Sequence, residues 1–211
     1  MFFSFEGIDG SGKSTQARLL ADALRERGYE VVEVREPGGT DLGERVRALL
    51  LDPAAAIDDR AELLLFSAAR AQLVSEVVRP ALDRGAVVVA DRFYDSSTAY
   101  QGGGREVALP EWLGSLHAFA TAGLVPTRTY FVDLDPGEAE RRRDGRSADR
   151  MESGGIDFYH RVRETYLRLA EDDRQRVRRL DARRSIEDLA DEIRNDALTC
   201  INNESPATRS E

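Results

Sequence analysis

The stretch that most constrains the fold lies at residues 7–14, which read Gly-Ile-Asp-Gly-Ser-Gly-Lys-Ser. This order fits the G-x-x-x-x-G-K-[ST] pattern of a phosphate-binding loop, the P-loop. An apolar run over residues 2–5 indicates a strand before the loop, and the apolar spacing over residues 13–27 indicates a helix after it. Such a unit points backbone N–H groups and the positive end of the helix dipole at a phosphate. The sequence therefore predicts a nucleotide-phosphate site at a turn between a strand and a helix.

Two side chains of this loop have separate expected roles: Lys13 reaches the β- and γ-phosphates of ATP, and the Ser14 hydroxyl holds Mg²⁺. The chain has 30 lysines and arginines together, and its only lysine is Lys13. A chance glycine-rich turn is the alternative interpretation. The glycine order, G-x-x-G-x-G, excludes the dinucleotide-binding fingerprint. We expect ATP to contact Gly7, Ile8, Asp9, Gly10, Ser11, Gly12, Lys13 and Ser14.

Composition narrows the class of protein. A chain of 211 residues with 41% hydrophobic and 33% charged residues is typical of one soluble globular domain. The net charge of −9 argues against nucleic acid as a partner. One cysteine, Cys200, excludes an internal disulfide framework, and we expect it to be a spectator thiol in a polar tail. No apolar run approaches the length of a membrane span, so we expect a cytoplasmic protein with no membrane partner.

Strand and helix patterns alternate along the chain, which predicts an α/β fold with a parallel sheet covered on both faces. We expect strands at 2–5, 30–34, 86–90, 129–134 and 177–180. We expect helices at 13–27, 41–51, 61–82 with a bend before Pro80, 93–101, 111–122, 137–143, 158–170 and 186–193. Glycines 102–104 are expected to break the fourth of these helices. A single domain over residues 1–195 and a polar, disordered tail over 196–211 complete the prediction.

Ligands of such sheets bind beyond the carboxyl ends of the strands. The P-loop, Glu36-Pro37, Asp91-Arg92 and Asp133 all fall at those ends. A GTPase would need an Asn-Lys-x-Asp element, which a chain with one lysine lacks, and the His-Arg-Asp loop of protein kinases is absent. What remains is a small phosphotransferase whose second substrate lies opposite ATP.

Four further motifs make a family resemblance specific. They are Asp91-Arg92-Phe93-Tyr94-Asp95-Ser96-Ser97-Thr98-Ala99-Tyr100-Gln101, Glu36-Pro37-Gly38-Gly39-Thr40, Leu65-Phe66-Ser67-Ala68-Ala69-Arg70-Ala71-Gln72, and Asp149-Arg150-Met151-Glu152 followed by Asp157-Phe158. In their order along the chain they resemble the thymidylate kinase family over about residues 1–195. The resemblance implies a nucleoside-monophosphate-kinase fold with a five-stranded parallel sheet, the reaction ATP + dTMP giving ADP + dTDP in dTTP synthesis for DNA replication, Mg²⁺, and a homodimer.

The resemblance also implies roles for single residues. Phe66 stacks on thymine, Arg70 bonds a base carbonyl, and Arg92 with Arg47 holds the dTMP phosphate. Ser97 contacts the pyrimidine edge, Tyr100 lies under the sugar, and Asp9 binds the 3′-hydroxyl or orients Arg92. The expected dTMP-binding set is Asp9, Glu36, Pro37, Arg47, Phe66, Arg70, Arg92, Ser97, Tyr100 and Gln101, and the expected metal-binding pair is Ser14 and Asp91. Helical spacing adds that Arg92, Ser97 and Tyr100 share one face.

Family members differ in where the catalytic arginine lies. The P-loop of this chain has none, whereas the lid, about residues 141–153, has Arg141, Arg142, Arg143, Arg146 and Arg150. The chain is therefore similar to the branch with lid arginines. The expected catalytic set is Lys13, Asp9, Arg92, Arg143, Arg146 and Arg150.

Several alternatives stay open at this stage. Phe66 and Tyr100 could be ordinary core residues, Arg70 could be a surface charge, and the lid could be a solvated basic loop. Asp133 and Asp135 suit either Mg²⁺ binding or capping of the next helix, and the helix at 61–82 suits either a dimer interface or simple burial. At the level of the whole protein, a nucleoside kinase that accepts thymidine and a non-catalytic nucleotide-binding protein are the competing classes.

Overall fold

The sheet has five parallel strands, as expected. The computed structural model describes residues 1–143 and 154–204. The strands are β1 (Phe2–Glu6), β2 (Val31–Arg35), β3 (Val87–Asp91), β4 (Arg128–Asp133) and β5 (Val177–Asp181). Their spatial order is β2-β3-β1-β4-β5, and each neighbouring pair is parallel. The carboxyl ends of all five strands therefore meet at one edge of the sheet.

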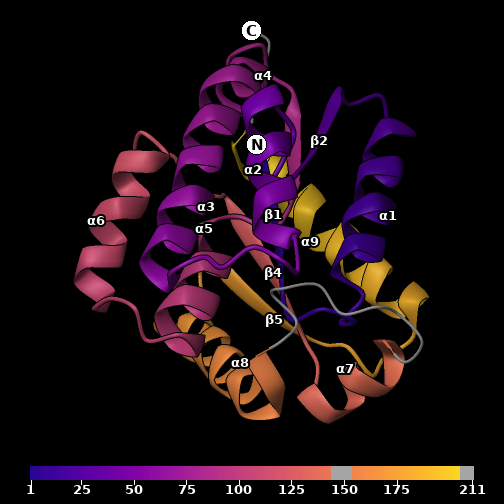
Figure 1. Cartoon of the computed structure of the whole chain (residues 1–211). Coiled ribbons are helices and arrows are strands. Elements are labelled where there is room, and N and C mark those ends of the chain that lie inside the picture. The colour runs from indigo at the N-terminus through magenta and orange to yellow at the C-terminus, as the bar shows by residue number, and fades with distance from the viewer. Residues whose placement is uncertain (144–153, 205–211) are drawn as a thin grey trace, which may run out of the picture.

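Helices cover both faces of this sheet. They are α1 (Lys13–Arg25), α2 (Asp41–Leu51), α3 (Asp59–Leu73), η1 (Val74–Val78), α4 (Arg79–Asp83), α5 (Tyr94–Ser97), η2 (Thr98–Gly104), α6 (Pro110–Ala120), α7 (Pro136–Arg143), α8 (Gly155–Asp172) and α9 (Ile186–Glu204). Figure 1 shows α1 and α9 on one side of the sheet and α3 and α8 on the other. Strand β1 lies in the middle and is buried along its whole length: Phe2 packs toward one face, and Phe3 and Phe5 toward the other.

Two helices contain π-helical turns that periodicity could not show. The expected long helix is present as α3, η1 and α4 in direct succession, and the π turn η1 ends just before Pro80. A proline cannot donate the ordinary helical hydrogen bond, and a widened turn is one way for a helix to accommodate it. The π turn η1 marks where the regular α-helix is interrupted before Pro80, and the bend itself stays a prediction.

The expectation that Gly102, Gly103 and Gly104 break a helix is wrong. These glycines lie inside η2, a π-helical continuation of α5. Helix α8 packs so closely against η2 that a Cβ at Gly103 would overlap the Thr165 side chain, and a Cβ at Gly104 would lie 2.8 Å from Val162 Cγ2. The glycines are required by close helix packing rather than by a turn.

The expected disordered tail is also wrong over residues 196–204. Helix α9 continues to Glu204, and Ala197 and Ile201 are buried against α1 and the sheet. Cys200 lies half-buried on this helix, and its Sγ is 3.4 Å from an Arg128 guanidinium nitrogen. The sequence prediction missed this part of the helix because polar residues outnumber the apolar residues that form its buried face. Within the described ranges, no helix has the length and apolarity that crossing a membrane requires.

Candidate active site

The P-loop lies at the carboxyl edge of the sheet, directly after the central strand β1. Gly7 has φ +142°, and a Cβ there would lie 2.6 Å from the Val132 carbonyl oxygen of β4. Gly10 and Gly12 also adopt positive φ angles, and α1 begins at Lys13. The glycines thus bring the loop against the sheet and turn its backbone toward the helix. The sequence prediction of a phosphate site depended on this arrangement of strand, glycine-rich turn and helix.

Lys13 and Asp9 form an ion pair across the P-loop. Lys13 Nζ lies 3.1 Å from Asp9 Oδ1, and Lys13 is 6% exposed. Ser14 is exposed at the first turn of α1, where its hydroxyl is accessible. Asp91 ends β3, and its Oδ1 is buried without a hydrogen-bond partner among the described residues. An exposed hydroxyl and an unsatisfied carboxylate oxygen are hard oxygen donors of the type that Mg²⁺ prefers.

Arg92 joins the P-loop to the segment that follows β3. Its backbone has φ +74°, and its Nη1 donates to the Gly7 carbonyl oxygen at 3.0 Å and to Ser96 Oγ at 3.1 Å. Its Nη2 donates to Asp9 Oδ1 at 2.7 Å and to the Tyr100 hydroxyl at 3.2 Å. The guanidinium carbon also lies 5.0 Å from the centre of the Tyr100 ring.

The shared helix face expected for Arg92 and Tyr100 was argued from a helix that does not include Arg92. Helix α5 begins at Tyr94, and the backbone of Arg92 is left-handed before it. The two side chains nevertheless meet: Tyr100 lies in η2, and its hydroxyl accepts a hydrogen bond from Arg92 Nη2. The proximity was correct and its geometric reason was wrong.

Asp9 is held as a carboxylate by its neighbours. Burial alone would raise the pKa of Asp9, but Lys13 and Arg92 hold it well below its usual range. The pKa of Tyr100 is raised by burial, so its hydroxyl keeps its proton and donates to Asp9 Oδ2 at 3.4 Å. The floor of the site therefore combines a fixed negative charge with two cations.

A pocket beside this floor collects the residues expected to bind the acceptor. The residues that line it are Asp9, Glu36, Pro37, Arg47, Leu51, Phe66, Arg92, Ser96, Ser97, Tyr100 and Gln101. Arg47 donates to the Pro37 carbonyl oxygen at 3.0 Å. Phe66 is only half-buried, so one of its faces is available to a ligand. Nine of the ten expected residues line this pocket, and the tenth, Arg70, lies behind its wall.

Arg70 is not the surface charge that the alternative interpretation proposed, since it is 1% exposed. Its Nε donates to Glu36 Oε2 at 2.8 Å, and its Nη2 donates to the Phe93 carbonyl oxygen and to Ser97 Oγ. Burial raises the pKa of Glu36, and Arg70 opposes that rise. Arg70 Nη1 and Glu36 Oε1 are buried without partners among the described residues. Unsatisfied buried atoms of this kind are where a ligand gains most from hydrogen bonding.

Two polar residues beneath Arg92, Glu6 and Tyr166, were missed by the sequence analysis. Glu6, at the end of β1, is fully buried and accepts hydrogen bonds from Phe93 N, Ser96 Oγ and the Tyr166 hydroxyl. Burial and the nearby Asp95 raise the pKa of Glu6 to about 7. A glutamate at the end of a mostly apolar buried strand was the available signal, because an acid is seldom buried without a reason.

Part of the expected lid lies outside the described residues. Arg146 and Arg150 lie there, and of Arg143 only the backbone position at the end of α7 is described. Arg142 pairs with Glu138 on its own helix. Asp133 is paired with Arg163 and Arg179, and Asp135 accepts from the backbone of Gly137 at the start of α7. The structure therefore favours capping over metal binding for Asp135.

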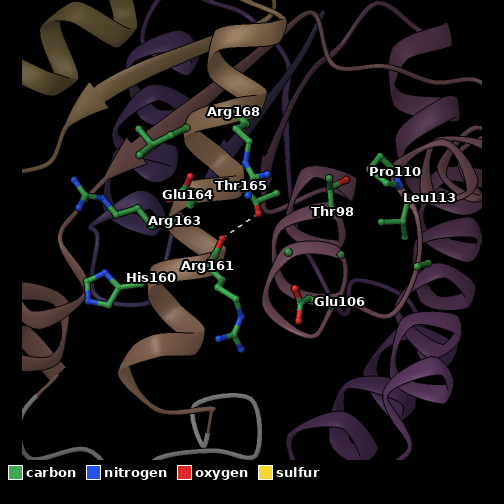
Figure 2. Close-up of a pocket in the computed structure, with 14 residues that line it drawn as sticks. Thr98, Glu106, Pro110, Leu113, His160, Arg161, Arg163, Glu164, Thr165 and Arg168 are labelled. Atoms are coloured by element: carbon green, nitrogen blue, oxygen red, sulfur yellow. Dashed lines mark hydrogen bonds between the residues drawn. The ribbon is translucent and has the colours of Figure 1, made fainter.

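A second hollow, larger than the acceptor pocket, contains none of the expected residues. It lies between α8 and the η2–α6 segment, and Figure 2 shows Thr98, Pro110 and Leu113 facing Arg161, Thr165 and Arg168 across it. Arg161 uses its guanidinium to donate to the Gly104 carbonyl oxygen at 2.9 Å. We assign no nucleotide to this hollow, since the P-loop and Arg92 do not line it.

Comparison with known proteins agrees with this geometry. The family model described as thymidylate kinase matches residues 5–193. A thymidylate kinase of Bifidobacterium longum (strain DJO10A) is 51% identical over 191 residues, which cover 89% of this chain and 92% of that protein. A thymidylate kinase of Thermosipho africanus (strain TCF52B) is 47% identical, covering 92% of this chain and 96% of the relative. The crystal structure of thymidylate kinase from Ehrlichia chaffeensis matches with a TM-score of 0.77 and 34% identity over 94% of this chain and 98% of that one. On the strength of its P-loop, its acceptor pocket and these matches, the chain belongs to the thymidylate kinase family.

Proposed function

We propose that the chain transfers the γ-phosphoryl group of ATP to dTMP, giving ADP and dTDP, and so supplies dTTP synthesis for DNA replication. The observation that supports the proposal most directly is that the P-loop and the acceptor pocket meet at Asp9 and Arg92. Asp9 belongs to the P-loop and also lines the acceptor pocket, and Arg92 bonds to it at 2.7 Å. A donor phosphate on the P-loop and an acceptor phosphate on Arg92 would thus be neighbours, as in-line transfer requires.

On the donor side, the loop Gly7, Ile8, Asp9, Gly10, Ser11, Gly12, Lys13 and Ser14 would hold the ATP phosphates. Lys13 supplies positive charge to the β- and γ-phosphates. Ser14 and Asp91 would hold Mg²⁺, which neutralises phosphate charge when bound. At least one of the lid residues Arg143, Arg146 and Arg150 would neutralise charge on the transferring group. Alanine at that arginine should lower kcat by about a thousandfold, whereas kcat within a few-fold for all three variants would leave the lid as a cover only.

On the acceptor side, the residues of the pocket complement the phosphate, base and sugar of a pyrimidine nucleoside monophosphate. Arg92 and Arg47 would bind the phosphate, since guanidinium groups bind phosphate oxygens in pairs. Phe66 would stack on the base, and Tyr100 would pack under the sugar. Ser97, Arg70 and Gln101 would read the base edge, with Glu36 and Pro37 completing the wall. Transfer needs alignment and charge neutralisation from these groups more than covalent work.

A homodimer in the cytoplasm is part of the proposal. Helices α3 and α6, with the residue preceding α6, carry large apolar side chains that are exposed in the single chain, namely Leu64, Leu109, Trp112 and Phe119. A patch of this kind is typical of a protein interface. Phe119→Asp should convert a dimer to a monomer in light scattering, and a wild-type monomer would contradict this part of the proposal.

One coupled assay tests the reaction. ADP release is measured with ATP and dTMP, thymidine, dUMP, dCMP or no acceptor. We expect dTMP to be the preferred acceptor. Preference for thymidine over dTMP would indicate a nucleoside kinase, in which Arg92 has no phosphate to hold. ADP release that no acceptor stimulates, together with tight ATP binding, would indicate a nucleotide-binding protein of another class.

A further inference from the structure

A buried carboxylate that the proposed reaction does not use lies behind the acceptor pocket. Glu62, on α3, is completely buried. Its Oε1 accepts from Gln101 Nε2 at 2.8 Å and from Arg105 Nε at 3.0 Å, and its Oε2 accepts from Arg105 Nη2 at 3.2 Å. One side chain thereby connects α3, η2 and the residue that follows η2. Glu62 Oε1 therefore accepts from both the Arg105 guanidinium and the Gln101 amide, and this determines the orientation of the amide.

The contact with Glu62 fixes which end of the Gln101 amide faces the pocket. A carboxylate with both oxygens against a guanidinium accepts hydrogen bonds and donates none. The Gln101 side chain must therefore present its NH₂ group to Glu62, because the reverse orientation would set two acceptors against each other. Gln101 lines the acceptor pocket, and its amide oxygen has no hydrogen-bond partner among the described residues. That oxygen is the acceptor left for a ligand.

Donors lie next to this oxygen, Ser97 in the pocket wall and Arg70 directly behind it. Arg70 Nη1 is buried and lacks a partner among residues 1–143 and 154–204. Arg70 Nη2 donates to Ser97 Oγ at 3.2 Å, which leaves the hydroxyl hydrogen of Ser97 free to donate. Ser97 and Gln101 are four residues apart across the α5–η2 junction, and both line the pocket. Beside these donors, the wall presents the Gln101 amide oxygen in a fixed orientation, and Glu36 Oε1 is a second acceptor next to Arg70.

This pattern distinguishes two pyrimidines of nearly the same shape. A 4-oxo pyrimidine such as thymine or uracil has a carbonyl acceptor at C4 and an N–H donor at N3. A 4-amino pyrimidine such as cytosine has a donor at C4 and an acceptor at N3. The 4-oxo base complements Arg70 and Gln101. The 4-amino base would place its C4 donor against the Arg70 donor and its N3 acceptor against the Gln101 oxygen, and unsatisfied polar groups are costly in a buried site.

We propose that Glu62 is a positioning residue that determines base specificity: it locks the Gln101 amide so that the pocket accepts 4-oxo and rejects 4-amino pyrimidine monophosphates. This inference rests on the proposed function, since it concerns the acceptor of the same reaction. It goes beyond that function by assigning the choice between oxo and amino bases to a residue that does not touch the substrate. Arg105 contributes by holding both carboxylate oxygens.

A purely structural role for Glu62 makes a different prediction. If the residue only ties α3 to η2, its replacement should lower kcat/KM for dTMP, dUMP and dCMP by similar factors. If it locks the amide, the ratio of dTMP to dCMP should fall while the ratio of dTMP to dUMP stays constant. Uracil has the same C4 and N3 groups as thymine, so dUMP is an internal control for general damage to the pocket.

The experiment measures kcat/KM for the three nucleotides in the wild-type protein and in Glu62→Gln. The introduced amide can meet Gln101 as donor or as acceptor, so both orientations of Gln101 become available. We expect the dTMP/dCMP ratio to fall by about tenfold, chiefly through KM for dCMP, and the dTMP/dUMP ratio to stay within about twofold. Asp59→Asn is the matched control: Asp59 lies on the same helix and pairs with Arg105 at 3.3 Å. Both ratios should be unchanged in that variant.

A second variant keeps the inference testable if Glu62→Gln does not fold. Gln101→Leu removes the acceptor itself and should also narrow the dTMP/dCMP ratio. An unchanged ratio in a folded Glu62→Gln, or in Gln101→Leu, would overturn the inference although dTMP turnover persists. Absence of dTMP turnover in the wild-type protein would instead overturn the proposed function, so the two failures are distinguishable.

Discussion

The buried glutamate beneath Arg92 predicts how the stability of this protein depends on pH. Burial and Asp95 raise the pKa of Glu6 from 4.5 to about 7, although Ser96, Arg92 and the Phe93 amide favour its charged form. The folded protein therefore holds this proton more tightly than the unfolded chain does. Stability from Glu6 increases as the pH falls through the folded pKa, and it levels off below the unfolded pKa. The linkage relation gives about 2 kcal/mol more stability at a pH of about 5.5 than at about 8.

A second buried group acts in the opposite direction over the same window. Burial, followed by the charge of Arg70, lowers the pKa of His117 from 6.5 to about 3. The unfolded chain therefore takes up this proton first, and stability falls by about 1 kcal/mol over the same pH interval. Asp9 does not disturb this balance, because its pKa is held below its usual range and it titrates at lower pH. The wild-type protein should change little in stability between the two conditions.

Replacement of Glu6 removes one side of this balance. In Glu6→Gln the gain is lost and the His117 effect remains, so the free energy of unfolding should fall by about 1 kcal/mol or more on acidification. Urea unfolding at the two pH values measures this directly, and Glu26→Gln, an exposed glutamate, is the control. The informative quantity is the difference in pH dependence, because the variant also loses hydrogen bonds and is destabilised at every pH. Parallel pH profiles for wild type and Glu6→Gln would refute the reasoning.

Three further variants probe other parts of the site. Lys13→Ala should remove most turnover while circular dichroism shows an intact fold, because no other lysine can supply its charge; full ADP production by the folded variant would exclude the assigned role. Tyr100→Ala should narrow a preference for dUMP over UMP that we expect to be about ten- to a hundredfold in kcat/KM, and an unchanged ratio would make the ring a core residue only. Gly103→Ala should lower the free energy of unfolding by about 2 kcal/mol, because its Cβ would lie 2.8 Å from Thr165 Cβ. Stability equal to wild type in thermal unfolding would show that α8 can move away at little cost.

The sequence predicted what depends on local pattern. The P-loop, the order of strands and helices, and the pocket side chains Arg92 and Tyr100 follow from motifs whose residues lie close together in the chain. These motifs converge because parallel strands place their carboxyl ends at one edge of the sheet. The convergence follows from parallel-sheet topology, and the expected pocket residues came from the family resemblance, so neither prediction depended on side-chain packing.

The features that were missed depend on contacts between distant segments. Glu6 meets Tyr166 across 160 residues of sequence, and no periodicity reveals such a pair. The glycines of η2 were predicted to break a helix, because the sequence does not show that close packing against α8 requires them. The first half of α9 was expected as a helix, whereas residues 196–204 were interpreted as a polar tail, because their apolar residues are sparse and become significant only when packed against α1. Tertiary packing decided each of these cases.

The single lysine gives the protein an intrinsic chemical reporter. Lys13 is the only side-chain amine in the sequence, and it lies 93% covered beside Asp9 at the centre of the donor site. Amine-directed reagents, whether acylating, alkylating or fluorescent, therefore have one side-chain target, and that target is in the P-loop. The rate at which they label it reads out occupancy of the loop, since a bound triphosphate would shield the amine. Covalent immobilisation through lysine would for the same reason attach the protein by its own P-loop, and the chain is better anchored through another group.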